Sequence, residues 1–181
     1  GAVGFRRVVL DEREGGFALR INDVPIFCRG ANWTPPDVVT LNAAPEPRLT
    51  RVRAAGMNML RLAGTLLYED VAFHHACDRM GILVWQDIML ANMDYPSADP
   101  TFCRELTAEV EALMARLAPS PSLVVVCGGS EVEQQAAMLG LPKEAWRSPL
   151  QAELIPSIIE RCRPDVVYWP NSPGNRDLDD Q

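Results

Sequence analysis

Residues 77–87 have the sequence Cys-Asp-Arg-Met-Gly-Ile-Leu-Val-Trp-Gln-Asp and contain one complete step of the pattern that decides the fold. The amphipathic stretch 69–80 runs into Gly81, where a left-handed helix cap is expected. The apolar run from Ile82 to Trp85 follows and ends in polar residues. A helix followed by a short apolar strand is typical of parallel sheets, in which crossover helices join the strands.

The same step recurs along the chain. Five short apolar runs alternate with helical stretches, and the runs are Ile26 to Cys28, Met57 to Leu62, Ile82 to Trp85, Leu123 to Cys127 and Val166 to Trp169. These runs are too apolar to have a solvated face. The stretches between them carry helix signals: Asp99 caps residues 99–118, Ser148 and Gln151 form a capping box for residues 149–163, and residues 47–55 run into Gly56.

Two α/β architectures fit this series. One is an open, doubly wound sheet with helices on both faces, and the length of 181 residues alone favours it. The other is a closed (β/α)8 barrel, which usually takes ~250 residues. The predicted strands start about 35 residues apart, so eight such units need about 280 residues, in line with a barrel. If the fold is a barrel, the chain therefore holds about its first five βα units.

A different pattern precedes the parallel series. Hydrophobic residues alternate within residues 5–21 and break at Glu14-Gly15-Gly16, which predicts a β-hairpin.

Charge and composition exclude several partners. The chain has 17 Lys and Arg against 24 Asp and Glu, a net charge of −7, so nucleic acid and anionic membranes are not expected partners. No apolar run reaches the ~18 residues that span a bilayer. Gly128-Gly129-Ser130 lacks the spacing of a nucleotide-binding loop, so we expect no cofactor.

Cysteine and histidine spacing argues against a metal site. The five cysteines stand apart without a CxxC pair, which favours buried free thiols and a reducing, cytoplasmic compartment; they are Cys28, Cys77, Cys103, Cys127 and Cys162. His74 and His75, with Cys77 and Asp78, lie on a predicted amphipathic helix, and adjacent histidines point in different directions around it. We therefore predict an ordinary helix surface and no metal.

In both architectures the functional face lies at the carboxyl ends of the strands. Polar or aromatic residues follow each run, and they are residues 29–33, Arg61, Gln86 and Asp87, residues 128–131, and Asn171. Glu131 is the strongest candidate, because a carboxyl group at the end of an apolar strand is partly desolvated and should have a raised pKa. Such a group can deliver a proton to a leaving oxygen. The alternative is a carboxylate at a helix N-terminus.

These residues resemble the catalytic domain of glycoside hydrolase family 2, in its beta-mannosidase branch. The matching phrases cover nearly the whole chain in order, and they are residues 16–22, 25–35, 57–61, 68–69, 77–87, 95–96, 121–123 and Glu131. The resemblance implies a (β/α)8 barrel, a carbohydrate substrate and retaining hydrolysis of a terminal beta-mannoside. It also implies a boundary, with residues 1–24 as a hairpin or linker from a preceding β-sandwich domain and residues 25–181 as the amino-terminal part of the barrel.

The resemblance assigns roles to five residues. Glu131 matches the general acid/base, Arg61 would orient the nucleophile, Asp87 would bond sugar hydroxyls, and Asn32 and Trp33 would line the sugar pocket. Each of three has a structural alternative: Arg61 and Asp87 could form a rim ion pair, and Trp33 could be a packing residue.

In this family the nucleophile, a second glutamate, follows the seventh strand, whereas the predicted series here reaches the fifth. We therefore expect the isolated chain to be inactive and to self-associate through the missing barrel half. Two departures, Gly129 in place of the family's usual Asn and Ala63 in place of Trp, keep a second hypothesis open. In it the chain is a non-catalytic carbohydrate-binding or structural remnant of a barrel.

Overall fold

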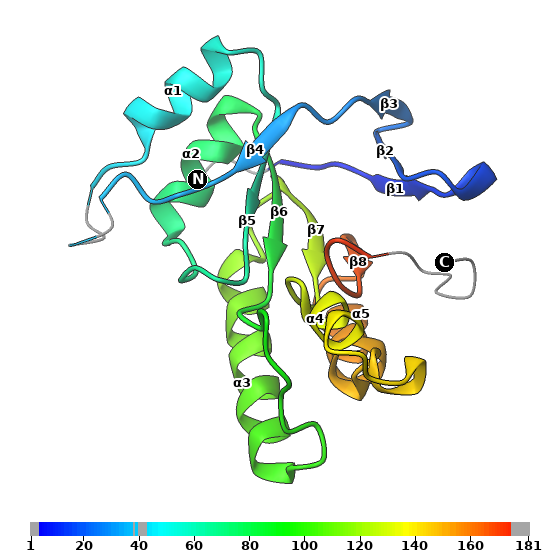
Figure 1. The fold of residues 1–181 in the computed structure, drawn as a ribbon. Helices are drawn as coiled ribbons and strands as arrows, with labels where there is room; N and C mark the ends of the chain where they lie inside the picture. The colour runs from blue at the N-terminus through cyan, green and yellow to red at the C-terminus, as the bar shows by residue number, and fades with distance from the viewer. Residues whose placement is uncertain (1–3, 38, 40–42, 175–181) are drawn as a thin grey trace.

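The computed structural model describes residues 4–37, 39 and 43–174 and contains two sheets (Figure 1). The first is antiparallel, in the order β1-β2-β3, and the second is parallel, in the order β4-β5-β6-β7-β8. The strands are β1 Val8–Asp11, β2 Ala18–Ile21, β3 Val24–Ile26, β4 Gly30–Asn32, β5 Met59–Leu62, β6 Leu83–Asp87, β7 Leu123–Cys127 and β8 Val167–Trp169.

The parallel strands follow one another in chain order, which distinguishes the two architectures considered above. A doubly wound sheet reverses its strand order and carries helices on both faces, whereas this sheet has no reversal. The doubly wound alternative is therefore wrong. The α/β class and the five consecutive parallel strands are confirmed, and closure into a complete barrel stays a prediction.

The helices begin and end close to the predicted signals. They are α1 Glu46–Ala54, α2 Val71–Met80, α3 Pro100–Leu117, α4 Val132–Met138 and α5 Ile155–Cys162, with a π-helix at Leu150–Leu154 and 3-10 turns at Arg13–Gly15 and Lys143–Ala145. The Asp99 carboxylate accepts a hydrogen bond from the Thr101 amide at 2.8 Å, which confirms this cap. Gly56 and Gly81 have φ values of 74° and 64°, which confirms both left-handed ends.

The helix predicted over residues 149–163 starts differently from the prediction. Its first turn is the π-helix, and α5 follows it directly. Ser148 Oγ accepts a hydrogen bond from the Leu150 amide at 3.2 Å, but the side-chain amide of Gln151 has no hydrogen-bond partner among the described residues. Only half of the predicted capping box therefore forms.

The predicted hairpin is confirmed, and β3 adds a third strand to it. The sequence pattern had instead assigned Ile26 to a parallel strand. Asn22 and Asp23 both have positive φ, 50° and 67°, the conformation of a tight two-residue hairpin turn. This turn sends β3 back along β2. The prediction of Ile26 to Cys28 as the first parallel strand is therefore wrong, and β4 takes that place.

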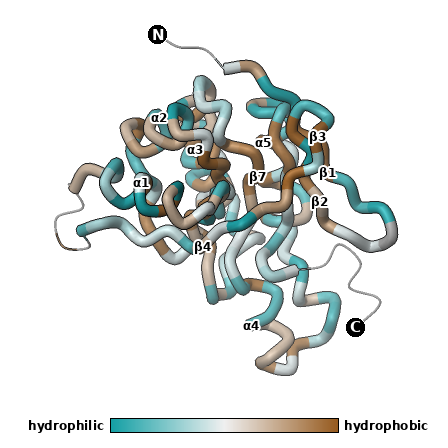
Figure 2. Tube along the Cα trace, turned by 90° about the horizontal axis from the view of Figure 1, so that it is seen from above, coloured by the Kyte–Doolittle hydropathy of each residue, from teal (hydrophilic) through white to brown (hydrophobic). Residues whose placement is uncertain are grey.

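Alternation along the parallel strands divides their side chains between two hydrophobic clusters. The outer face packs on the helices through residues such as Leu60, Leu62, Val84 and Val126. The inner face packs against the antiparallel sheet, whose Leu19 is 1% exposed. Figure 2, turned by 90° from Figure 1, shows hydrophobic segments around α3, α5 and β7, with α1 and α2 on one side and β1 and β2 on the other.

The aromatic ring of Phe17 strengthens this inner contact. Its centroid lies 5.6 Å from that of Trp85 and 4.9 Å from that of Trp169, with the second pair edge to face. The antiparallel sheet therefore covers part of the inner face, and the carboxyl ends of the strands carry polar groups instead.

Several predictions about single side chains need correction. All five cysteines are free, as predicted, but Cys28 is exposed because it lies in the link between the two sheets. His74 is buried against the sheet, so the helix surface predicted for it is wrong, whereas the burial of Cys77 agrees with the buried thiol predicted there. Among the described residues no group of three or more His, Cys, Asp or Glu could hold a metal ion. In the same part of the chain, no helix combines the length and hydrophobicity needed to cross a membrane.

Candidate functional site

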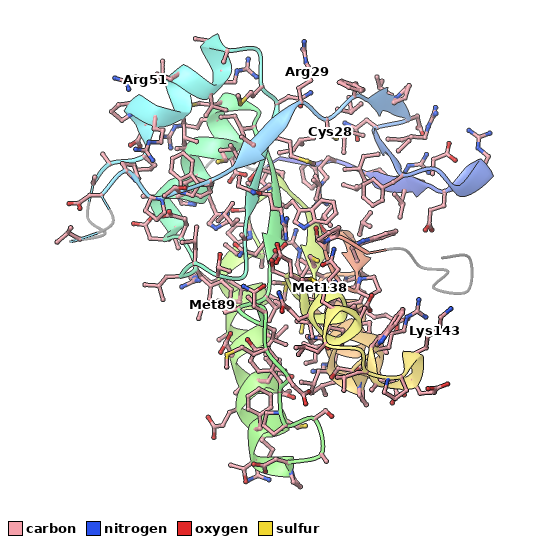
Figure 3. All side chains as sticks on the ribbon, viewed as in Figure 1. Cys28, Arg29, Arg51, Met89, Met138 and Lys143 are labelled. Carbon is pink, nitrogen blue, oxygen red and sulfur yellow. The ribbon has the colours of Figure 1, made fainter. Side chains whose placement is uncertain are left out.

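The candidate site lies where the parallel strands end, on their inner face. In Figure 3, two labelled residues lie at this end of the sheet: Met89, which follows β6, and Met138, which is on α4. Cys28 and Arg29 lie at the opposite end. The strand register brings Asn32 beside Arg61 and Asp87 beside Cys127. Ser130 and Glu131 follow β7, and Ser172 follows β8. The structure thus gathers polar groups from five consecutive strand ends.

Arg61 and Asp87 form the central ion pair of this rim. Arg61 Nη2 lies 2.7 Å from Asp87 Oδ2, and Arg61 Nε donates to the same oxygen at 3.1 Å. The Asp87 side chain is 0% exposed and that of Arg61 is 24% exposed. The ion-pair alternative stated for these two residues is therefore what the structure contains, with the geometry of a two-pronged guanidinium–carboxylate pair.

Two further donors complete the surroundings of Asp87. The indole Nε1 of Trp85 donates to Oδ1 at 2.8 Å, and the Gly64 amide donates to Oδ2 at 3.2 Å. With the guanidinium, these donors occupy both oxygens of the carboxylate. Asp87 therefore has no exposed oxygen for the sugar hydroxyls that the resemblance assigns to it.

Burial and pairing act in opposite directions on this pair. Burial raises the pKa of the Asp87 carboxyl, and the hydrogen bonds and charge of Arg61 act against that rise. For Arg61, burial lowers the pKa, but the hydrogen bonds and charge of Asp87 outweigh it, so the net direction is upward. Each partner thus depends on the other to keep its charge in a partly dry environment.

Arg61 also reaches the two strand ends beyond Asp87. Its Nη2 donates to Ser130 Oγ at 3.2 Å and to the Ser172 carbonyl at 3.4 Å. One guanidinium therefore links the ends of β5, β6, β7 and β8. Neither Ser130 nor Ser172 was predicted as a contact of Arg61, although both follow predicted strands and the same strand-end rule covers them.

Glu131 stands beside this network and is exposed. The partial desolvation predicted for Glu131 is not found, because none of the described elements covers this part of the inner rim. Its backbone is in the left-handed region, with φ 60° and ψ 17°, a costly conformation for a residue other than glycine. It occupies the N-cap position of α4, yet its side chain accepts no hydrogen bond from that helix. The alternative stated for Glu131, a carboxylate at a helix N-terminus, is therefore confirmed in position, without a side-chain hydrogen bond to that helix.

Backbone contacts hold the Glu131 loop in place. The Glu131 amide donates to the Ser172 carbonyl at 3.0 Å, and the next amide, of Val132, donates to Asn171 Oδ1 at 3.1 Å. Asn171 is 1% exposed and its own amide donates to the Pro173 carbonyl. Asn171, which the sequence placed at the rim, therefore fixes the start of α4.

Close packing explains the glycines before Glu131. A β-carbon on Gly128 would lie 2.3 Å from the Tyr168 hydroxyl and 2.5 Å from the Pro170 carbonyl oxygen. One on Gly129 would meet Gln151 Nε2 at 3.2 Å. Because glycine has no β-carbon, these two residues allow the chain to approach β8 and the π-helix closely. Their sequence spacing does not match a nucleotide-binding loop.

Asn32 and Trp33 are neighbours in sequence but lie in different environments. Asn32 is exposed at the end of β4, paired in register with Arg61. Trp33 is 3% exposed, and its ring lies 4.9 Å from that of Phe73 on α2. Its indole nitrogen donates to Glu69 at 2.6 Å. The structure thus places Asn32 at the rim and gives Trp33 the packing role stated as its alternative.

The sequence is similar to known beta-mannosidases. It is 35% identical over 179 residues to beta-mannosidase B of Aspergillus niger, covering 90% of this chain and 21% of that protein, and 32% identical over the same share to beta-mannosidase B of Emericella nidulans. The chain therefore spans about a fifth of the length of these relatives. No family model matches the sequence.

Solved structures agree with this result. The crystal structure of beta-D-mannosidase from Dictyoglomus thermophilum superposes with a TM-score of 0.85 and 34% sequence identity, covering 94% of this chain and 22% of that one. A beta-glucuronidase from Bacteroides uniformis gives a TM-score of 0.71 at 16% identity, covering 92% of this chain and 20% of that one, which indicates the shared fold alone. The resemblance to the beta-mannosidase branch of glycoside hydrolase family 2 is thereby confirmed.

Proposed function

Because the chain matches a segment of beta-mannosidases in both sequence and fold, we propose that it forms the amino-terminal part of the catalytic barrel of a retaining beta-mannosidase. The observation that carries the proposal is the rim itself. Five parallel strands in chain order bring Asn32, Arg61 and the Glu131 loop to one end of one face. Active sites of (β/α)8 enzymes are built at this end of the strands.

Glu131 is the general acid/base in this proposal. It lies on the rim, it is exposed to an incoming substrate, and its side chain makes no hydrogen bond to α4, whose N-cap position it occupies. Protonated, it would donate its proton to the glycosidic oxygen as the bond to the sugar breaks, and it would then take a proton from the water that attacks the glycosyl-enzyme. Its left-handed backbone supports a functional role, since such strain is concentrated at active sites.

The nucleophile belongs to a strand other than these five. Retaining hydrolysis requires a second carboxylate about 5–5.5 Å from the first. Among the described residues of the Arg61 network, the carboxylate is Asp87, but it is fully buried and both its oxygens accept hydrogen bonds from Arg61, Trp85 and Gly64. We therefore assign Asp87 the role of holding Arg61, and the isolated chain should not hydrolyse glycosides.

Arg61 and Asn32 are the remaining site residues of the proposal. The guanidinium of Arg61 is fixed by Asp87 and partly exposed, so it can orient the incoming nucleophile by a charge-assisted hydrogen bond. Asn32, exposed in the neighbouring register position, can donate and accept hydrogen bonds with sugar hydroxyls. Trp33, which follows Asn32, is held by its ring contact with Phe73 and by the hydrogen bond from its indole nitrogen to Glu69, and it thereby stabilises the end of β4.

The proposal is tested by replacing Glu131 with Gln in the longest gene product that contains this sequence. Turnover of an aryl beta-mannoside with a poor leaving group should fall by about 10²–10⁴-fold, because the proton donor is lost. Azide should restore turnover of a substrate whose leaving group needs no proton, since azide can attack the glycosyl-enzyme without base assistance.

Glu105→Gln, an exposed carboxylate on α3, is the matched control and should keep full activity. Undiminished turnover of Glu131→Gln would overturn the role of Glu131. Binding of the mannoside without turnover by the unmutated protein would instead support the non-catalytic carbohydrate-binding alternative.

A further inference from the structure

The chain that follows β6 runs beside the loop that carries Glu131. Ala91 pairs with Ser130 in a parallel bridge. The Ser130 amide donates to the Leu90 carbonyl at 2.8 Å, and the Asn92 amide donates to the Ser130 carbonyl at 3.0 Å. Because Glu131 comes directly after Ser130, these backbone contacts fix the start of the Glu131 loop.

The residues next to this bridge share an unusual backbone conformation. Asn92 and Glu131 both lie in the left-handed region, with φ values of 57° and 60°. Asparagine adopts this conformation readily, whereas glutamate does not. A strained residue keeps its conformation only where its surroundings hold it there. The contacts of Ser130 with the neighbouring chain therefore help to hold Glu131 in its orientation.

The hydroxyl of Tyr95 binds both polar atoms of the Ala91 backbone. The Ala91 amide donates to this hydroxyl at 2.7 Å, and the hydroxyl donates to the Ala91 carbonyl at 3.1 Å. The ring of Tyr95 stacks on that of Phe102 in α3, with the two centroids 6.0 Å apart. Tyr95 thus ties Ala91, the partner of Ser130, to a long helix.

A second tyrosine holds the same chain segment two residues earlier. The amide of Met89, which Figure 3 labels, donates to the Tyr68 hydroxyl at 3.1 Å. That hydroxyl donates in turn to Glu109 Oε1 on α3 at 2.6 Å. A hydroxyl group can accept and donate at the same time, so each tyrosine connects the segment to a further contact. Loss of either hydroxyl would leave a partly buried backbone amide without its partner.

We propose that Tyr95 and Tyr68 are positioning residues for proton transfer by Glu131. Their hydroxyls hold residues 89–91, and this segment holds the Glu131 loop through Ser130. The inference rests on the proposed function of Glu131 and adds residues that act on it without touching the substrate. Proton transfer requires hydrogen-bond distance between the carboxyl group and the glycosidic oxygen, so a small displacement of the loop should slow it.

Two beta-mannosides with different leaving groups test this role. The phenyl glycoside has a poor leaving group that needs a proton, whereas dinitrophenolate leaves without one. In the longest gene product that contains this sequence, Tyr95→Phe should lower kcat/KM for the phenyl substrate by about 10–100-fold, and for the dinitrophenyl substrate by no more than about twofold. Tyr68→Phe should show the same selectivity with a smaller loss, because its hydroxyl binds further from Ser130.

Thr107→Val is the matched control. It removes a hydroxyl that also donates to a backbone carbonyl four residues earlier, that of Cys103 within α3, at 2.7 Å. Both substrates should keep their full kcat/KM in this variant. Equal losses with both substrates, or no loss with either, would overturn the role of the tyrosine concerned, because a purely structural role lowers the active fraction alike for both. If Tyr95→Phe does not fold, Tyr68→Phe decides.

A double variant separates this inference from the proposed function. In protein that already carries Glu131→Gln, Tyr95→Phe should lower the residual turnover of the phenyl substrate no further, because no proton donor remains to be positioned. A further loss would show that Tyr95 acts by another route and would overturn the proposal. Undiminished turnover in Glu131→Gln alone would overturn the proposed function together with this inference, whereas a loss confined to Glu131→Gln overturns this inference alone.

Discussion

The two faces of the parallel sheet are built from the same strands but differ in composition. On the outer face, Leu60, Leu62 and Val84 are buried against helices without any charge among them. On the inner face, apolar residues give way to Arg61 and Asp87 towards the carboxyl ends of β5 and β6. Burial of these apolar side chains stabilises the outer face, whereas the carboxyl end of the inner face depends on a hydrogen-bonded ion pair.

The difference shows where this protein carries its chemistry. An apolar face tolerates substitution as long as volume is kept, because the hydrophobic effect has no direction. A buried ion pair tolerates little, because removal of one partner leaves the other charged and unpaired. The geometry of the inner rim is therefore specified by a few polar contacts, and those contacts are the sensitive points of the structure.

The largest effect should come from Asp87→Ala. This change leaves Arg61, the indole of Trp85 and the Gly64 amide without their shared acceptor, and it should lower the free energy of unfolding by about 3–5 kcal/mol. Urea denaturation of the chain measures this loss. Asp99→Ala, which removes only the cap of α3, should cost about 1 kcal/mol and serves as the control. Equal costs for the two variants would contradict the importance given to the ion pair.

A second pair of variants compares packing on the two faces. Leu60→Ala on the outer face removes a side chain that is 1% exposed and should cost about 3 kcal/mol. Phe17→Ala, in the cover of the inner face, removes a larger ring that is already 40% exposed, so it should cost only about 1 kcal/mol. The same denaturation assay gives both values. A larger loss for Phe17→Ala would mean that the antiparallel sheet stabilises the inner face more than the helices stabilise the outer one.

A pH-dependent effect should come from His74, the buried histidine of the outer side. His74 on α2 is 0% exposed, and burial lowers its pKa from 6.5 to about 4. Well above pH 6.5 the imidazole of His74 is neutral in both the folded and the unfolded chain. Below pH 6.5 it binds a proton in the unfolded chain but stays neutral in the folded chain. The free energy of unfolding should therefore fall by about 2 kcal/mol between pH 6.5 and pH 5 because of this residue.

Substitutions at the two adjacent histidines separate this effect from other titrations. His74→Leu should remove that part of the pH dependence, whereas His75→Gln should keep it, because His75 is exposed. An unchanged pH profile in His74→Leu would show that the buried imidazole does not govern acid stability on this side of the sheet.

Local signals in the sequence predicted much of this architecture. Asp99 and Gly81 mark helix ends by the chemistry of single residues, and the structure has both ends where they were predicted. Four of the five predicted parallel strands are present as well. The remaining prediction, a first parallel strand that starts at Ile26, failed because the left-handed pair Asn22-Asp23 turns the chain back and pairs β3 with β2.

Side-chain environments were harder to predict than elements. Glu131 was expected to be partly desolvated and is exposed, His74 was expected on a surface and is buried, and Gln151 was expected to cap a helix and faces Gly129. In each case the local pattern was correct about the strand or helix. The environment depended on which other elements pack there, and that information is distributed over the whole chain.

The sequence by itself determined the α/β class, the parallel strands and the identity of the residues at the strand ends, because periodicity, caps and turns act over a few neighbouring residues. Only the tertiary structure decided that Asp87 supports Arg61 and that Trp33 packs under the rim. Only it revealed that the Gln151 amide is buried without a hydrogen-bond partner in the described part of the chain. These features depend on register and packing between segments far apart in the chain, which local physical chemistry does not specify.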